Sequence, residues 1–214
     1  MRNDRQKIAR PFLLAIALLG WFALIAQLYI NINSKINPLP ETLTRYFSYF
    51  TIDTNLIVAL CCSFILLAAG SVPGKFFSRQ STQTAITIYI IIVGIVYNIV
   101  LRQIWKPEGL QKIVDELLHL IIPILFLLYW LFFVQKNELK WRHAFSWMIY
   151  PLLYGIFVFC RGYASGFYPY PFIDMSILGM NQTIINSIGF VFVFLIAGII
   201  FIGIGRLMSK KKMS

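Results

Sequence analysis

Apolar residues fall into six long blocks along the chain, each close to the length that crosses a lipid bilayer as a helix. A hydrocarbon core about 30 Å thick needs about 20 apolar helical residues to span it. The apolar residues run on without the every-second-residue alternation of a porin-like strand. Asp53 is the one Asp, Glu, Lys or Arg within the blocks, which cover residues 11–31, 51–72, 84–101, 117–135, 144–160 and 183–205. The pattern predicts an all-α fold, a bundle of six transmembrane helices.

The breaks between the blocks are short and carry residues that end helices. Asn37-Pro38-Leu39-Pro40 follows the first block, and a charged run from Lys136 to Arg142 follows the fourth. No domain linker, internal repeat or low-complexity tract is visible in the sequence apart from a basic tail. We therefore predict one transmembrane domain over residues 1–214.

The overall composition excludes a soluble domain. Apolar side chains make up 59% of the 214 residues and charged ones 13%, with a mean hydropathy of +0.75. An average soluble domain has about 25% charged residues, and a chain with so few cannot cover its surface in water. We expect an integral multi-pass membrane protein whose partners include membrane lipids.

The net charge of +11 is strongly asymmetric once the six spans are in place. With the N-terminus in the cytoplasm, the cytoplasmic segments carry 13 of the 19 Lys and Arg residues but two of the eight acidic residues. Cytoplasmic loops of membrane proteins are enriched in Lys and Arg, so we predict that both termini are cytoplasmic. Topology and attraction to anionic lipid explain the basic excess without a nucleic-acid partner. The oligomeric state stays open.

Polar residues inside a membrane are costly and therefore informative about function. Thr51, Thr54 and Asn55 share one face of the second predicted helix, because they are spaced three and four residues apart. The predicted topology puts them in the outer half of the membrane with the other unusual polar residues, which are Asp53, Asn98, Arg102, Asp115, Glu116, His119, Tyr154 and Arg161. We expect a functional cavity there; a polar network that only stabilises the bundle is the alternative.

Pro123 lies four residues after His119 in the fourth predicted helix. Proline has no backbone N–H and cannot donate to the carbonyl oxygen of residue 119. The sequence predicts that this oxygen lacks its helical hydrogen bond.

The chemistry of the expected cavity centres on His119. A hydroxyl nucleophile needs a base within hydrogen-bond reach, and His119 is the only histidine in the predicted outer half. Asp115, one turn earlier, is a candidate to orient the imidazole. The candidate nucleophiles are Thr51, Thr54 and Ser48, and the candidate oxyanion donors are Asn55, Arg102 and a tyrosine hydroxyl.

A metal site is the rival chemistry, with Asp115, Glu116 and His119 as its ligands. All three come from one helix and no second histidine is near, which disfavours a metal centre. The sequence contains no Gly-rich phosphate loop and no GxSxG or HExxH motif. We therefore predict neither a metal nor a cofactor.

Three short motifs carry a resemblance to a known family. They are Tyr49-Phe50-Thr51 at the start of the second helix, His119 with Pro123 in the fourth, and Tyr170-Pro171-Phe172 before the sixth. With these motifs and its six spans, the chain resembles the membrane proteins related to androgen-induced protein and androgen-dependent TFPI-regulating protein. Asp53 and Thr54-Asn55-Leu56 are similar to the bacterial branch, usually labelled Pr-six-Pr, which implies the cytoplasmic membrane of a bacterium.

The resemblance implies a function and two catalytic residues. The characterised animal members are hydrolases that cleave esters between a fatty acid and a hydroxylated fatty acid, using a membrane-embedded threonine and histidine. Carried over to this sequence, the resemblance implies Thr51 as nucleophile, His119 as base and a lipid ester as substrate. A non-enzymatic protein that binds lipid or transports a small solute is the alternative, although transporters usually contain repeats and helices broken at mid-membrane.

Overall fold

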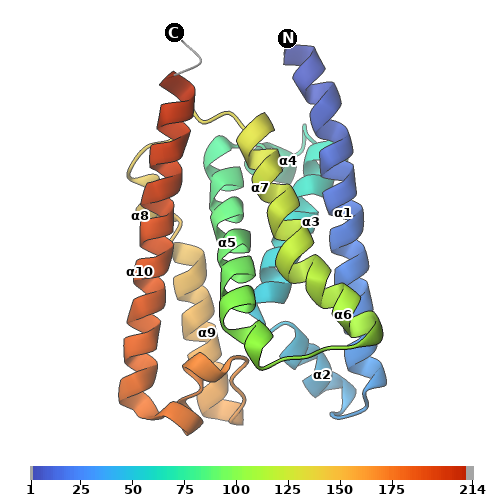
Figure 1. The fold of residues 1–214 in the computed structure, drawn as a ribbon, viewed down its shortest axis with the longest axis vertical. Helices are drawn as coiled ribbons and strands as arrows, with labels where there is room; N and C mark the ends of the chain where they lie inside the picture. Colours follow the sequence, from blue (N-terminus) through green and yellow to red (C-terminus); the bar gives the residue numbers. More distant parts are fainter. Residues whose placement is uncertain (1, 211–214) are drawn as a thin grey trace. The chain divides into compact units, whose positions relative to one another are not determined.

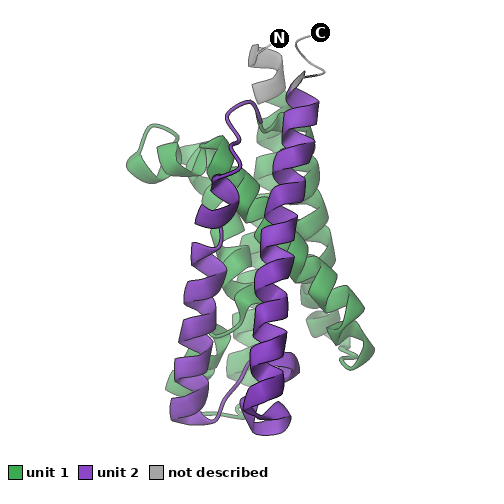
Figure 2. Cartoon of the chain, turned by 90° about the vertical axis from the view of Figure 1, so that its left-hand side faces the viewer, with its two compact units in different colours: residues 1–135 green, residues 136–214 purple. Residues whose placement is uncertain are grey.

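The computed structural model describes residues 2–210, with side chains from residue 7 to residue 209. The basic clusters at the two chain ends, which contribute to the predicted topology, lie partly outside the described residues. The chain divides into two compact units, Met1–Gln135 and Lys136–Ser214 (Figure 2). The predicted single domain over residues 1–214 stays a prediction.

Six helical segments are long and apolar enough to cross a membrane, and the described residues form no strands. This confirms the predicted fold class and a multi-pass membrane protein. The segments are Lys7–Asn33, Phe50–Leu67, Gln80–Gln103, Gly109–Phe133, His143–Ser165 and Met175–Ser209.

The first unit contains four of these segments and two short connecting helices (Figure 1). Helix α6 continues through a five-residue π-helical turn, η2, into α7, so that the three form one rod (Figure 1). The elements in chain order are α1 (Arg2–Asn33), α2 (Leu39–Tyr46), α3 (Phe50–Leu67), α4 (Val72–Phe77), α5 (Gln80–Ile99), η1 (Leu101–Gln103), α6 (Gly109–Glu116), η2 (Leu117–Ile121) and α7 (Ile122–Phe133).

The second unit contains two long helices and two short turns of helix, and its last helix begins earlier than predicted. Gly179 has φ 73° and ψ 166°, a non-helical conformation that glycine adopts readily and that joins a short N-terminal stretch to the long helix. The hydropathy pattern predicts that the span begins at residue 183, because Asn181 and Gln182 interrupt the apolar run. The elements are α8 (His143–Ser146), α9 (Ile149–Ser165), η3 (Pro171–Ile173) and α10 (Met175–Lys210).

The second predicted span, residues 51–72, is shorter in the structure. Helix α3 ends at Leu67, and Ser71 begins α4 as an N-cap whose hydroxyl accepts a hydrogen bond from the Gly74 amide at 3.1 Å. A Cβ on Gly74 would lie 2.0 Å from the Ala68 carbonyl oxygen, so the tight turn requires glycine. Apolarity continues through this turn, which is why hydropathy alone placed the boundary five residues too late.

Helices α1 and α3 approach closely along their lengths. A Cβ added to Gly20 would lie 3.2 Å from the Ala59 Cβ, and the Trp21 indole N–H donates to the Ser63 hydroxyl at 3.1 Å. Near the α2 end of the unit, the Tyr46 hydroxyl donates to the Leu24 carbonyl at 2.8 Å. Burial raises the pKa of Tyr46 to about 12, so its hydroxyl stays protonated and remains a donor. These contacts hold the helix that carries Thr51 in place.

The centre of the first unit is filled by large side chains from α5 and α7. Phe126 and Trp130 are essentially fully buried, and the Trp130 indole N–H donates to the Thr84 hydroxyl at 2.9 Å. Because lipid tails are as apolar as these side chains, close packing and interhelical hydrogen bonds stabilise the bundle.

We expect Gly20→Leu to destabilise the first unit by about 1–3 kcal/mol, because a branched side chain must force α1 away from α3. The measurement is the thermal unfolding midpoint of the detergent-purified protein. Gly189→Leu is the matched control, because a Cβ at Gly189 meets nothing within 4 Å. Equal midpoints for the two variants would contradict the close approach of α1 and α3.

Candidate active site

The site is organised around a π-helical turn that interrupts the α6–α7 rod. The Ile122 amide donates to the Leu117 carbonyl, five residues back, in place of the four-residue spacing of an α-helix. Pro123 follows directly and has no N–H. The helix changes from five- to four-residue spacing here, which leaves one carbonyl without a donor, and the missing Pro123 N–H leaves a second, so that the Leu118 and His119 carbonyls are both affected. Two adjacent carbonyl groups therefore need donors from outside their own helix.

Two asparagines from neighbouring helices supply these donors. Asn55 on α3 donates from Nδ2 to the Leu118 carbonyl at 3.2 Å, and Asn98 on α5 donates to the His119 carbonyl at 3.1 Å. Each side chain also donates to the carbonyl four residues back on its own helix, Asn55 to Thr51 at 2.9 Å and Asn98 to Gly94 at 2.8 Å. The two amides therefore connect α3 and α5 to the same turn.

The sequence predicted a carbonyl without its helical partner at His119 but did not predict the one at Leu118. That oxygen loses its partner only because the helix adopts π spacing here, and hydropathy carries no signal for the spacing. The pairing of Asn55 and Asn98 with these oxygens was also not predicted, because it depends on how three helices pack.

His119 lies in the π turn and is buried, with 8% of its surface exposed. Its Nδ1 is 2.9 Å from the backbone carbonyl oxygen of Asp115. Since a carbonyl oxygen only accepts hydrogen bonds, this contact assigns the proton of a neutral imidazole to Nδ1. The Nε2 atom then carries the lone pair, which is the form a general base requires.

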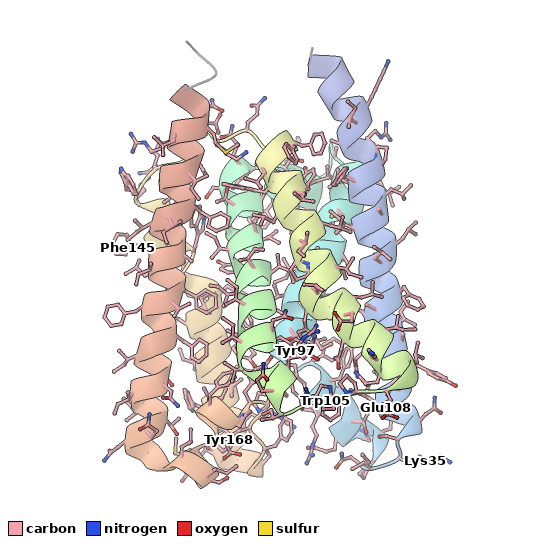
Figure 3. All side chains as sticks on the ribbon, viewed as in Figure 1. Lys35, Tyr97, Trp105, Glu108, Phe145 and Tyr168 are labelled. Carbon is pink, nitrogen blue, oxygen red and sulfur yellow. The ribbon has the colours of Figure 1, made fainter. Side chains whose placement is uncertain are left out.

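The imidazole ring is also held from its face. The Tyr97 ring stacks on it with centroids 3.7 Å apart and an interplanar angle of 10° (Tyr97 is labelled in Figure 3). A Cβ on Gly94 would lie 3.0 Å from the His119 carbonyl oxygen and 3.3 Å from Pro123 Cβ. Glycine at position 94 therefore permits α5 to approach the turn closely enough for the ring stack.

The Asp115 carboxylate makes its closest contacts away from His119, although the sequence suggested that it orients the imidazole. Its Oδ1 lies 3.8 Å from His119 Nδ1, whereas Oδ2 accepts from the Trp105 indole N–H at 2.6 Å. Gln111 donates to Oδ1 at 3.3 Å, and the Tyr97 hydroxyl also bonds to this carboxylate. The backbone carbonyl of residue 115 orients the imidazole instead. Trp105, labelled in Figure 3, follows η1, and sequence reasoning missed its role.

Arg102 departs from its predicted place on a helical face with Asn98. Helix α5 ends at Ile99, and Arg102 belongs to the following 3₁₀ turn, η1. Its Nη2 lies 2.7 Å from Glu116 Oε1, and its guanidinium lies 5.6 Å from the Tyr97 ring centroid. Arg102 thus pairs with the carboxylate next to Asp115 and contacts the ring that stacks on His119.

The polar face predicted for the start of the second span is buried in the first unit. Thr51 is 8% exposed, Thr54 and Asn55 are fully buried, and Asp53 is half-buried. Both Nδ2 hydrogens of Asn55 are engaged by carbonyl groups, so this amide supports the turn and has no free N–H for an oxyanion. Asn55 connects the helix turn of Thr51 to the turn of His119. A direct contact of Thr51 Oγ1 with His119 Nε2 stays a prediction.

Tyr154 and Arg161 lie on α9 in the second unit. Both are half-buried, and the Arg161 guanidinium lies 4.9 Å from the Phe167 ring centroid. Their membership of the same site as Thr51 and His119 stays a prediction.

The two carboxylates considered as metal ligands, Asp115 and Glu116, bond to different partners. The Asp115 carboxylate bonds to Trp105 and Gln111, and Glu116 pairs with Arg102. Among residues 7–209, no three His, Cys, Asp or Glu side chains are grouped closely enough to hold a metal ion.

Comparisons with known family models, curated proteins and solved structures found no match to this chain. The family resemblance of its short motifs therefore stays a prediction.

We expect the two asparagines to be coupled energetically to Pro123. Asn98→Leu should destabilise the protein by about 1–2 kcal/mol, and by less in a Pro123→Ala background, where the restored N–H supplies a donor to the turn. A double-mutant cycle from thermal unfolding in detergent measures this coupling. Trp21→Phe, which removes a hydrogen bond between α1 and α3, should be additive with Pro123→Ala. Additivity of Asn98→Leu with Pro123→Ala would contradict the proposed role of the asparagine.

Proposed function

We propose that this protein is an intramembrane hydrolase of lipid esters, with Thr51 as nucleophile and His119 as general base. The observation that carries the proposal is the buried His119, whose Nδ1 is bound to a backbone carbonyl and whose ring is stacked on Tyr97. This arrangement leaves Nε2 in the base form, and Asn55 connects the turn of His119 to the helix that carries the buried Thr51 and Thr54.

In the proposed first step, Nε2 of His119 removes the Thr51 hydroxyl proton as Oγ1 attacks the ester carbonyl carbon. The tetrahedral intermediate collapses, the bond to the alcohol oxygen breaks, and His119 returns the proton to the leaving alcohol. The products of this step are a free alcohol and an acyl ester on Thr51. Hydrolysis of that ester by water releases the fatty acid and restores the threonine.

A lipid ester is the proposed substrate class because the reacting groups are surrounded by helices of membrane length and apolar composition. Acyl chains are soluble in this environment, so the substrate reaches the site from the lipid phase without crossing water. The burial of His119 and Thr51 away from water also strengthens any hydrogen bond to the developing oxyanion.

The proposed setting is a bacterial cytoplasmic membrane with both termini in the cytoplasm and the site in the outer half of the bilayer. The charge asymmetry of the sequence supports this orientation. The bonds from Asn55 on α3 and Asn98 on α5 to η2 support grouping these polar residues in one site.

We expect a fluorophosphonate probe to label the wild-type protein in native membranes and to leave Thr51→Ala unlabelled, because the variant lacks the attacking oxygen. His119→Ala should reduce the labelling rate at least about 100-fold, the lower range of general-base contributions. Gel fluorescence normalised to protein amount measures both effects.

Thr87→Ala is the matched control for the Thr51 variant. Thr87 is fully buried on α5, and its hydroxyl donates at 2.7 Å to the Gln83 carbonyl of its own helix. It should be labelled as strongly as wild type, and Thr51→Ser should retain labelling. Undiminished labelling of Thr51→Ala would exclude this nucleophile, and unlabelled wild-type protein would favour a lipid-binding or transport function.

The proposed orientation predicts which positions a membrane-impermeant maleimide reaches in intact cells. Single cysteines are introduced at Lys35 and Ser209 in a Cys160→Ser background, since Cys160 is exposed while Cys61 and Cys62 are buried. We expect labelling of Lys35→Cys in intact cells and of Ser209→Cys only after permeabilisation. The reverse labelling pattern would contradict the proposed orientation and indicate that both termini are outside the cytoplasm.

A further inference from the structure

Asn55 contains a buried hydrogen-bond acceptor for which the structure describes no donor. The residue is fully buried, and its Oδ1 has no hydrogen-bond partner among residues 7–209. Exchanging the amide oxygen and nitrogen would not give Oδ1 a donor. Nδ2 donates to the carbonyls of Thr51 and Leu118, and an oxygen in its place would be repelled by both. The orientation of the amide, and so the position of Oδ1, is determined by these two bonds.

A buried acceptor without a donor is unfavourable, and more so in a helix bundle surrounded by lipid. Buried polar atoms in folded proteins are nearly always bonded to protein or to ordered water. Asn98 makes the equivalent pair of bonds to the Gly94 and His119 carbonyls. Asn98 is half-buried, however, and the buried atoms that lack a partner include Asn55 Oδ1 but not Asn98 Oδ1. The need for a further donor is therefore specific to Asn55.

The acceptor lies close to both proposed catalytic residues. In an amide the oxygen and nitrogen are about 2.2 Å apart, from C=O and C–N bonds of about 1.23 and 1.33 Å. With Nδ2 at 2.9 Å from the Thr51 carbonyl oxygen and 3.2 Å from that of Leu118, Oδ1 lies within about 5.5 Å of both. A donor bound to Oδ1 at about 3 Å therefore lies within about 8.5 Å of both carbonyl oxygens, one of Thr51 and the other of the residue before His119.

We propose that Asn55 Oδ1 binds an internal water molecule, and that this water hydrolyses the acyl ester on Thr51. The binding of the water rests on the orphaned acceptor alone, whereas its catalytic role rests on the proposed hydrolase function. Water fits this position because it is small and donates to Oδ1 through one hydrogen while its second hydrogen stays available to a base.

The hydrolytic step balances with these groups. The water oxygen attacks the acyl carbon of the Thr51 ester while His119 Nε2 accepts one water proton. The bond between the acyl carbon and Thr51 Oγ1 then breaks, and His119 returns the proton to that oxygen. A carboxylic acid is released, and both Thr51 and His119 regain their starting protonation states.

The first experiment tests the water site in the wild-type protein. A density map from cryo-electron microscopy or crystallography, at a resolution that shows ordered water, should contain a water peak at hydrogen-bond distance, about 2.7–3.2 Å, from Asn55 Oδ1. A map in which a protein group donates to Oδ1, or in which no ordered density lies within that distance, would overturn the proposal. This test requires neither a variant nor activity.

The second experiment tests the catalytic role by separating acylation from deacylation. Stopped-flow hydrolysis of a chromogenic medium-chain ester in detergent reports acylation as a burst and deacylation as the steady-state rate. For Asn55→Leu we expect deacylation to slow at least about 10-fold, with acylation within about threefold of wild type. Acyl-Thr51 should accumulate and be detected by mass spectrometry of the intact protein.

Asn98→Leu is the matched control, because it removes an equivalent pair of bonds to the π turn without removing an orphaned acceptor. It should change acylation and deacylation by the same factor. The same uniform loss in Asn55→Leu would assign Asn55 a structural role only and overturn the catalytic part of the proposal. Should Asn55→Leu fail to fold, the density map decides the water site. Failure of the hydrolase function itself is distinct: the wild-type protein then shows neither burst nor probe labelling, whatever the map contains.

Discussion

The first unit depends on one helix turn that lacks backbone donors, because a π turn is followed directly by Pro123, which has no N–H. In lipid, every backbone carbonyl must find a partner within the protein. The proline lies just after a π turn, so the carbonyls of Leu118 and His119 both lose their helical partners, and Asn55 and Asn98 replace them from two other helices. A π turn followed by a proline therefore connects α3, α5 and the α6–α7 rod at one turn.

The same constraint shapes the environment of the histidine. The π turn presents His119 so that Nδ1 meets the Asp115 carbonyl while its ring stacks on Tyr97. The Asp115 carboxylate is drawn instead toward Trp105 and Gln111, and Gln111 continues the network to Gln27 on α1 at 2.7 Å. A buried histidine oriented by a backbone carbonyl needs no adjacent carboxylate to define its tautomer. The Asp115 carbonyl thus binds Nδ1 and leaves Nε2 as the basic atom of the imidazole.

Sequence reasoning identified the polar residues of this region better than it identified their partners. Spacing placed Thr51, Thr54 and Asn55 on one helical face, and all three are buried. Spacing failed for Arg102, because α5 ends at Ile99 and a 3₁₀ turn redirects the chain toward Glu116. Helix ends are set by local hydrogen bonding that hydropathy does not record. Trp105, in a loop, had no periodic signal that could connect it to Asp115.

The sequence by itself determined that this is a membrane protein and how many membrane-length helices it has. It also determined that Pro123 cannot donate to the His119 carbonyl. These properties follow from side-chain transfer energies and from the chemistry of proline, both of which act locally along the chain. The tertiary structure alone decided that Asn55 and Asn98 bond to neighbouring carbonyls of one turn, and that a backbone oxygen orients His119. The asparagine contacts join residues 63 and 21 positions apart, so they arise from helix packing and leave no local pattern in the sequence. The contact of His119 with the Asp115 carbonyl is local, but it involves the π turn, which hydropathy does not record.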